Sequence, residues 1–155
     1  MKKHIAEFKT VLLALHGTSC ELRRLKHDQL SVAFFAVDTP ILRSYTAPLQ
    51  NLKTLHLNFE AIVTPRMIFW QRLGEFLQAL HALKDLKFGF APFDNEAGNN
   101  GTWCDGTDPR TWYVPLWKML GDHTWKGLER LSLEGLVLCE NGLFNLLKRH
   151  SQTLR

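Results

Sequence analysis

Three side chains in this sequence have types that together could perform nucleophilic catalysis: Cys104, Asp105 and His123. A thiol becomes a strong nucleophile when a histidine accepts its proton and a carboxylate orients that histidine. Spacing alone does not establish that His123 comes within hydrogen-bond distance of the thiol. Neither a Gly-x-Ser-x-Gly motif nor a phosphate-binding Gly-rich loop is present. The leading prediction is therefore a protein that is not an enzyme, and the alternative is a small α/β enzyme with a Cys/His site.

Potential metal ligands are present but lack the spacing of known sites. Asp94, Glu96, Asp105 and Asp108 fall in one segment, yet they do not follow the ligand positions of an EF-hand loop. The 3 cysteines and 7 histidines form neither a Cys-x-x-Cys nor a His-x-x-x-His pair. We therefore expect no metal and no other cofactor.

The elements that would position any such site follow a repeat. The pattern Leu-x-x-Leu-x-apolar occurs as LRRLKH, LKTLHL, LKDLKF and LERLSL, starting at Leu22, Leu52, Leu83 and Leu128, with His27 as the one departure at the sixth place. A strand with apolar residues at every second place, preceded by a helical pattern, is one unit of a stacked repeat. The sequence therefore predicts an α/β solenoid of helix-turn-strand units with a parallel sheet.

Apolar residues at helical spacing predict the helices of these units. The predicted helices cover residues 5–15, 41–47, 65–80, 114–120 and 143–147, the second of them short and ended by Pro48. The run from Ser31 to Val37 is apolar and β-prone, and it precedes a break at Asp38-Thr39-Pro40. Residues 91–111, rich in Gly, Asn, Asp and Pro, predict an inserted loop.

Two segments carry a resemblance to a known family. In LLKRHSQTLR and LLALHGTSCELRRL, a helix ends in a His-rich or Ser-rich turn before a Leu-x-x-Leu strand. This arrangement resembles the irregular leucine-rich repeats of fungal proteins, many of which carry an F-box, and it spans nearly the whole chain. The resemblance implies a short leucine-rich-repeat-like solenoid over residues 1–155. It also implies a scaffold, or the substrate-recognition part of a ubiquitin-ligase receptor, although no F-box can be matched to residues 1–20.

The resemblance departs from the full repeat pattern at one position. Leucine-rich repeats place Asn or Cys at the ninth position, where these copies carry Leu30, Glu60, Ala91 and Leu136. We therefore expect no asparagine ladder.

The third and fifth positions of each strand are predicted to face solvent on one shared surface. These positions are Arg24 and Lys26, Thr54 and His56, Asp85 and Lys87, and Arg130 and Ser132. Five of the eight can carry positive charge, which favours an acidic protein partner. The alternative is that these residues are only the polar, edge-protecting face of a solvated sheet.

The inserted loop is a second candidate binding surface because long loops on rigid scaffolds often carry binding residues. It contains Trp103, and Trp112 and Tyr113 lie at its end. Aromatic side chains are frequent anchors of protein interfaces. Trp112, Tyr113 and Trp117 can instead pack inward from the helix that follows, and we expect that arrangement for them.

Composition sets the remaining expectations. The 155 residues are 45% hydrophobic, with 19 basic and 15 acidic residues and a net charge of +4. The charges are interspersed, so we expect no nucleic-acid partner, and a small-molecule ligand is not favoured. Scattered cysteines and the absence of a long apolar run predict an intracellular protein without a membrane span.

The last two residues carry one further expectation. Leu154 begins what reads as a fifth copy of the pattern, followed only by Arg155. The chain is therefore either part of a longer repeat array or a shorter array with a frayed tail.

Overall fold

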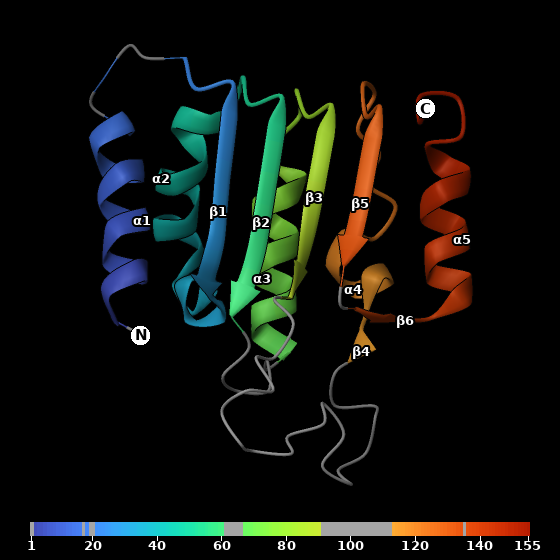
Figure 1. The fold of residues 1–155 in the computed structure, drawn as a ribbon, viewed down its shortest axis with the longest axis horizontal. Helices are drawn as coiled ribbons and strands as arrows, with labels where there is room; N and C mark the ends of the chain where they lie inside the picture. Colours follow the sequence, from blue (N-terminus) through green and yellow to red (C-terminus); the bar gives the residue numbers. More distant parts are fainter. Residues whose placement is uncertain (1, 17, 19–20, 61–66, 91–112, 135) are drawn as a thin grey trace, which may run out of the picture.

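The fold is a parallel sheet with helices packed against one of its faces. The computed structural model describes residues 2–16, 18, 21–60, 67–90, 113–134 and 136–155. The elements are α1 (Lys2–His16), β1 (Arg24–Ser31), η1 (Val32–Phe35), α2 (Thr39–Thr46), η2 (Ala47–Leu49), β2 (Thr54–Glu60), α3 (Met67–Gln78), β3 (Asp85–Phe90), β4 (Tyr113–Val114), α4 (Leu116–Leu120), β5 (Arg130–Glu134), β6 (Val137–Leu138) and α5 (Glu140–Arg149). Strands β1, β2, β3 and β5 form one sheet in that order, and every neighbouring pair is parallel (Figure 1). The predicted α/β fold with a parallel sheet and alternating helices and strands is confirmed.

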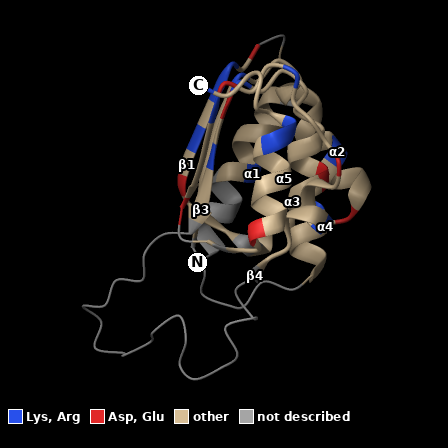
Figure 2. Ribbon diagram, turned by 90° about the vertical axis from the view of Figure 1, so that its right-hand side faces the viewer, with Lys and Arg blue, Asp and Glu red and all other residues tan. Residues whose placement is uncertain are grey.

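The helices lie together on one side of the four-stranded sheet, which gives two layers (Figure 2). Because side chains alternate along a strand, every second residue points into the space between the layers. On β2 these residues are Leu55 and Leu57, and on β3 they are Leu86 and Phe88, all at most 1% exposed. The leucine pattern of the sequence is therefore the apolar lining of the sheet.

A repeated backbone contact holds the strands at the same level. The Arg23 carbonyl accepts hydrogen bonds from the N–H groups of Lys53 (2.9 Å) and Thr54 (3.1 Å), just before β2 begins. The next two steps repeat this geometry, with N···O distances of 2.8–3.0 Å: Lys84 and Asp85 donate to Lys53, and Glu129 and Arg130 donate to Lys84. Consequently Arg24, Thr54, Asp85 and Arg130 lie side by side in one row across the sheet.

The turn before strands β2, β3 and β5 also repeats. The first leucine of the pattern donates its N–H to the carbonyl three residues earlier, from Leu52 to Leu49 (3.0 Å) and from Leu83 to Leu80 (3.3 Å). In the fourth unit Leu128 bonds the Trp125 carbonyl at 3.3 Å, so a buried tryptophan takes the place of the earlier leucines.

The predicted β-prone run from Ser31 to Val37 is wrong beyond its first residue. Strand β1 ends at Ser31, whose hydroxyl accepts a hydrogen bond from the Ala33 N–H (3.3 Å) at the start of η1. Phe34 and Phe35 are both fully buried. Adjacent residues of a strand point to opposite faces, so a strand in this one-sided sheet could not bury both rings. The 3₁₀ turn buries both of them.

Helix boundaries also shift from the predicted ones. Helix α2 begins at Thr39, because Pro40 lies in its first turn, where a missing N–H costs nothing. Helix α5 begins at Glu140 and takes Asn141-Gly142 into its first turn.

Among the described helices, none has the length and apolar composition needed to cross a bilayer.

The predicted fifth copy of the pattern starts in the structure as the others do. The Arg155 N–H donates to the Glu129 carbonyl at 3.0 Å, which continues the row of contacts made by Lys53, Lys84 and Glu129. Leu154 is partly buried against the core. The backbone therefore enters the position of a further strand beside β5.

Gly74 provides a test of the packing between α3 and α4. A Cβ atom added there would lie 2.0 Å from the Met119 carbonyl oxygen, too close for any side chain. We predict that Gly74→Ala lowers the free energy of unfolding by about 1–3 kcal/mol, because the two helices must separate. Urea denaturation followed by circular dichroism measures the change.

Gly142→Ala is the matched control within a helix. Its added Cβ would meet only ordinary contacts, at 3.7 Å from Leu116 and 3.9 Å from Cys139. The better helix propensity of alanine should leave stability equal or raise it by up to about 1 kcal/mol. Equal effects of the two substitutions would contradict the close approach of α3 and α4 at Gly74.

Candidate functional site: the exposed face of the sheet

The sheet surface opposite the helices carries two polar rows that cross all four strands. We call this surface the sheet face. The first row is Arg24, Thr54, Asp85 and Arg130, and the second is Lys26, His56, Lys87 and Ser132. All predicted binding residues within the described chain (Arg24, Lys26, His56, Lys87 and Arg130) therefore share one surface. Figure 2 shows basic and acidic residues mixed along these strands.

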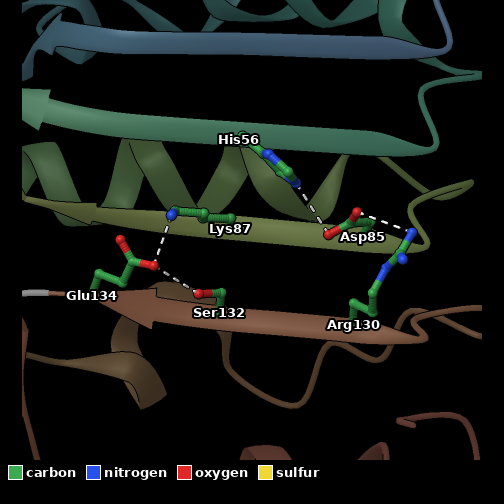
Figure 3. Close-up of polar contacts among 6 residues, drawn as sticks. All are labelled: His56, Asp85, Lys87, Arg130, Ser132 and Glu134. Atoms are coloured by element: carbon green, nitrogen blue, oxygen red, sulfur yellow. Dashed lines mark hydrogen bonds and ion pairs between the residues drawn. The ribbon is translucent and has the colours of Figure 1, made fainter.

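Asp85 links the two rows. Its Oδ1 atom lies 3.2 Å from Nε2 of His56, and its Oδ2 atom lies 3.3 Å from Nη2 of Arg130 (Figure 3). The Asp85 side chain is only 17% exposed, whereas Arg130 is 72% exposed. The carboxylate is thus held between β2 and β5, while much of the guanidinium still faces water.

A second group lies farther along the same strands. Nζ of Lys87 is 2.7 Å from Oε1 of Glu134, and the Ser132 hydroxyl donates to the same oxygen at 3.2 Å (Figure 3). The hydrogen bond from Lys87 is the main reason that the pKa of Glu134 lies below its ordinary value, and Ser132 adds to this shift. Glu134 was not among the predicted residues because it falls one alternation beyond the fifth position of its strand.

A matching ion pair joins the starts of β3 and β5. Nζ of Lys84 lies 3.0 Å from Oε1 of Glu129, and this hydrogen bond lowers the pKa of Glu129. Both carboxylates are well exposed, so solvent screens these pairs and they add little to stability. Their effect is to neutralise the charges of Lys84 and Lys87.

Arg24 and Lys26 on β1 differ from the other cations of the sheet face. Both are exposed, and neither forms an ion pair with any side chain that the structure describes. The positive character predicted for the whole face is therefore concentrated on β1. Cross-strand pairing cancels much of it on β3 and β5.

The other predicted loop residues cannot be placed. Trp103 and the inserted loop lie outside the described residues, as do Cys104, Asp105 and the carboxylates considered for calcium. Trp117 is described, and the expectation that it packs inward is wrong, because 61% of its surface is exposed on α4.

Within the described chain, no three His, Cys, Asp or Glu side chains are grouped closely enough to hold a metal ion.

His123 is the one member of the predicted Cys/His site whose surroundings are described. Its ring packs edge-on against Trp125, with centroids 4.8 Å apart, and lies 6.2 Å from the His81 ring. Burial lowers the pKa of His123, and the charges of His81, His150 and Arg149 lower it further.

Two grooves open on the helical side of the molecule, one between α4 and α5 and one between α2 and α3, and His123 lines neither.

The two Lys–Glu pairs predict a reciprocal pair of pKa changes. Lys87→Met should raise the pKa of Glu134 toward its ordinary value of 4.5 and leave Glu129 unchanged, because the main hydrogen bond is removed. Lys84→Met should do the same for Glu129 and leave Glu134 unchanged. Titration of the side-chain carboxyl carbons by NMR measures both. A Glu134 pKa that Lys87→Met does not move would show that the cross-strand contact is absent in solution.

The lowered pKa of His123 predicts that the protein loses stability in acid. The folded-state pKa lies below the ordinary value of 6.5, so below about pH 6.5 the unfolded chain binds a proton that the folded chain does not. The free energy of unfolding should therefore fall as the pH drops from 7.5 to about 5.5, and the fall should be smaller in His123→Gln. Urea denaturation at the two pH values measures this difference.

His81→Gln is the control for that measurement. Burial ranks above His81 as a cause of the lowered pKa, so this variant should keep most of the pH dependence. A His123→Gln protein that loses as much stability in acid as the parent would rule out His123 as a source of the effect.

Comparison of the chain with protein-family models, with curated proteins and with solved structures finds no match.

Proposed function

We propose that this chain is a short leucine-rich-repeat-type solenoid that binds a protein partner through its sheet face. The observation that carries the proposal is the pair of exposed, unpaired cations Arg24 and Lys26, which lie in the same two rows as the neutralised network of β3 and β5. A partner segment with acidic side chains gains most on β1. Farther along the rows, the fixed donors and acceptors around Asp85 and Glu134 favour polar contacts of defined geometry.

The rigidity of the surface also supports binding. Each outward residue alternates with a buried one, and the repeated carbonyl contacts fix the spacing between strands. A preformed surface loses little conformational entropy when a partner docks, so more of the contact energy contributes to affinity. The resemblance to F-box proteins makes the substrate-recognition part of a ubiquitin-ligase receptor the first form of scaffold to test.

The sheet face can be tested by charge reversal where no ion pair is broken. We predict that Arg24→Glu together with Lys26→Glu weakens partner binding by at least about tenfold, because acidic groups then meet like charge. Proteins captured from lysate by the parent chain are identified, and the dissociation constant of each purified candidate is measured for both proteins. Circular dichroism confirms that the variant is folded.

Lys126→Glu together with Lys148→Glu is the matched control. Both lysines are exposed and lie outside the sheet, so the change in net charge is the same. This variant should bind as the parent does. Equal losses of affinity in the two double variants would show that only the net charge of the protein matters. Unchanged binding by the Arg24/Lys26 variant would contradict a partner on the sheet face.

A further inference from the structure

The groove between α4 and α5 has an apolar floor and an exposed aromatic wall. It encloses about 260 Å³ and lies in the helical layer, away from the sheet face (Figures 1 and 2). Leu116, Leu120 and Leu146 form the floor and are at most 3% exposed, whereas Trp117 beside them is 61% exposed. An aromatic ring that remains in water next to an apolar hollow is a surface that a ligand can cover.

Helix α5 brings polar groups to the same groove. Gly142, Asn145 and Arg149 follow one another at steps of three and four residues, so they lie on one face of the helix, toward α4. Asn145 is exposed, and the Arg149 side chain is 25% exposed in the last turn. The groove therefore combines a leucine floor with an amide and a guanidinium.

The guanidinium of Arg149 is poorly used by the protein itself. Its Nη1 atom lies 3.7 Å from Oδ1 of Asp122, which is longer than a hydrogen bond. Its Nε atom is buried and has no hydrogen-bond partner among the described residues. Asp122 is fully exposed, so water competes for its carboxylate and the ion pair is weak. Arg149 can therefore accept a second carboxylate, from a ligand, at little cost.

The local charge also favours an anion. Among the described residues that line the groove, Arg149 and Asp122 are the charged ones. Lys118 adds a second cation at the rim, because its Nζ atom lies 4.9 Å from the centre of the Trp117 ring. A carboxylate that replaces Asp122 beside Arg149 thus enters a region of net positive charge.

The length of the groove limits the size of its occupant. Helix α4 has 5 residues, which gives a wall about 7.5 Å long at 1.5 Å per residue. Two turns of a partner helix would extend about 11 Å and overrun this wall. A peptide would also bring backbone polar groups to a lining whose one uncharged polar side chain, within the described chain, is that of Asn145. A single ring with a short acidic arm fits these limits.

We propose that the groove between α4 and α5 binds a small aromatic carboxylate. The ring lies on the leucine floor against Trp117, and the carboxylate accepts hydrogen bonds from Arg149 in place of the weak contact with Asp122. The amide of Asn145 offers one further donor. None of these residues belongs to the sheet face, so the site does not depend on the function proposed for that surface.

The probe is phenylacetate, compared with phenylacetamide, which has nearly the same shape and no charge. Titrations followed by NMR should show that phenylacetate binds with a dissociation constant of about 1 mM or lower, at least about tenfold tighter than the amide. The indole N–H of Trp117 and the side-chain amide of Asn145 should shift together. No binding, equal binding of the two compounds, or shifts confined to other residues overturns the proposal.

Charge changes at the groove test the role of Arg149. Arg149→Met should weaken phenylacetate binding by about tenfold and leave binding of the amide unchanged, a difference that a general loss of structure would not produce. Asp122→Asn should tighten phenylacetate binding by about threefold, because the competing carboxylate is removed. Arg149→Met that keeps the preference for the acid overturns the proposal.

Arg43→Met is the matched control. Arg43 is exposed in the groove between α2 and α3, so this variant loses the same charge at a distant place. It should bind phenylacetate as the parent does, and circular dichroism checks that each variant is folded. A loss of affinity equal to that of Arg149→Met would overturn the assignment of the site to the groove.

The end of a partner protein is the competing occupant, because an aromatic C-terminal residue carries the same chemical groups. A peptide that ends in Gly-Gly-Phe with a free carboxylate tests this alternative. Binding at least about tenfold tighter than that of phenylacetate would overturn the proposal in favour of a docking site for a chain end. Equal or weaker binding supports the small ligand.

Discussion

The structure depends on one backbone contact made at the start of each unit, in which a carbonyl accepts two N–H groups from the unit that follows. The contact recurs at Arg23, Lys53 and Lys84 with nearly the same distances. A shift of one residue would turn every leucine of the next strand toward solvent, so this contact and the leucine pattern enforce the same register. The alignment of the outward side chains into rows is a consequence of that register.

The sequence was sufficient for the four strands of the main sheet and for their parallel order, because both follow from a local pattern that repeats. The two-residue strands β4 and β6 were not predicted, and Val114 was assigned to a helix. The sequence was not sufficient where contacts with neighbouring strands or turns decide the local structure or the exposure of a side chain. Phe34 and Phe35 read as part of a strand, but the need to bury two adjacent rings favours a 3₁₀ turn. Trp117 has the spacing of a core residue, yet it lies on the outer side of a helix of only five residues. The ion pairs of Glu134 and Asp85 depend on distances between neighbouring strands, and these distances cannot be read from the sequence.

The pairing on the sheet face changes what its charges can do. Five of the eight outward positions can carry positive charge, but Lys87 and Arg130 each face a carboxylate across a strand boundary. Exposed cations without partners act over longer distances and mainly raise association rates, whereas paired groups offer directed hydrogen bonds and favour one orientation. The same rows can therefore attract an acidic partner at β1 and select its orientation at β3 and β5.

Different contacts hold the helices beside β1 and β5, the two outer strands of the described sheet. At the first end, Phe8 of α1 packs edge-on against Phe34 and His27, so an aromatic cluster closes the core. At the other end, polar bonds hold the last helix. The backbone N–H of Trp125 donates to Nε2 of the buried His150 at 3.0 Å, and Nδ1 of the same ring lies 2.9 Å from the Leu146 carbonyl, so the ring joins the turn before β5 to helix α5. Because these polar contacts anchor α5, the helix keeps its place although Phe144 and Leu147 are exposed.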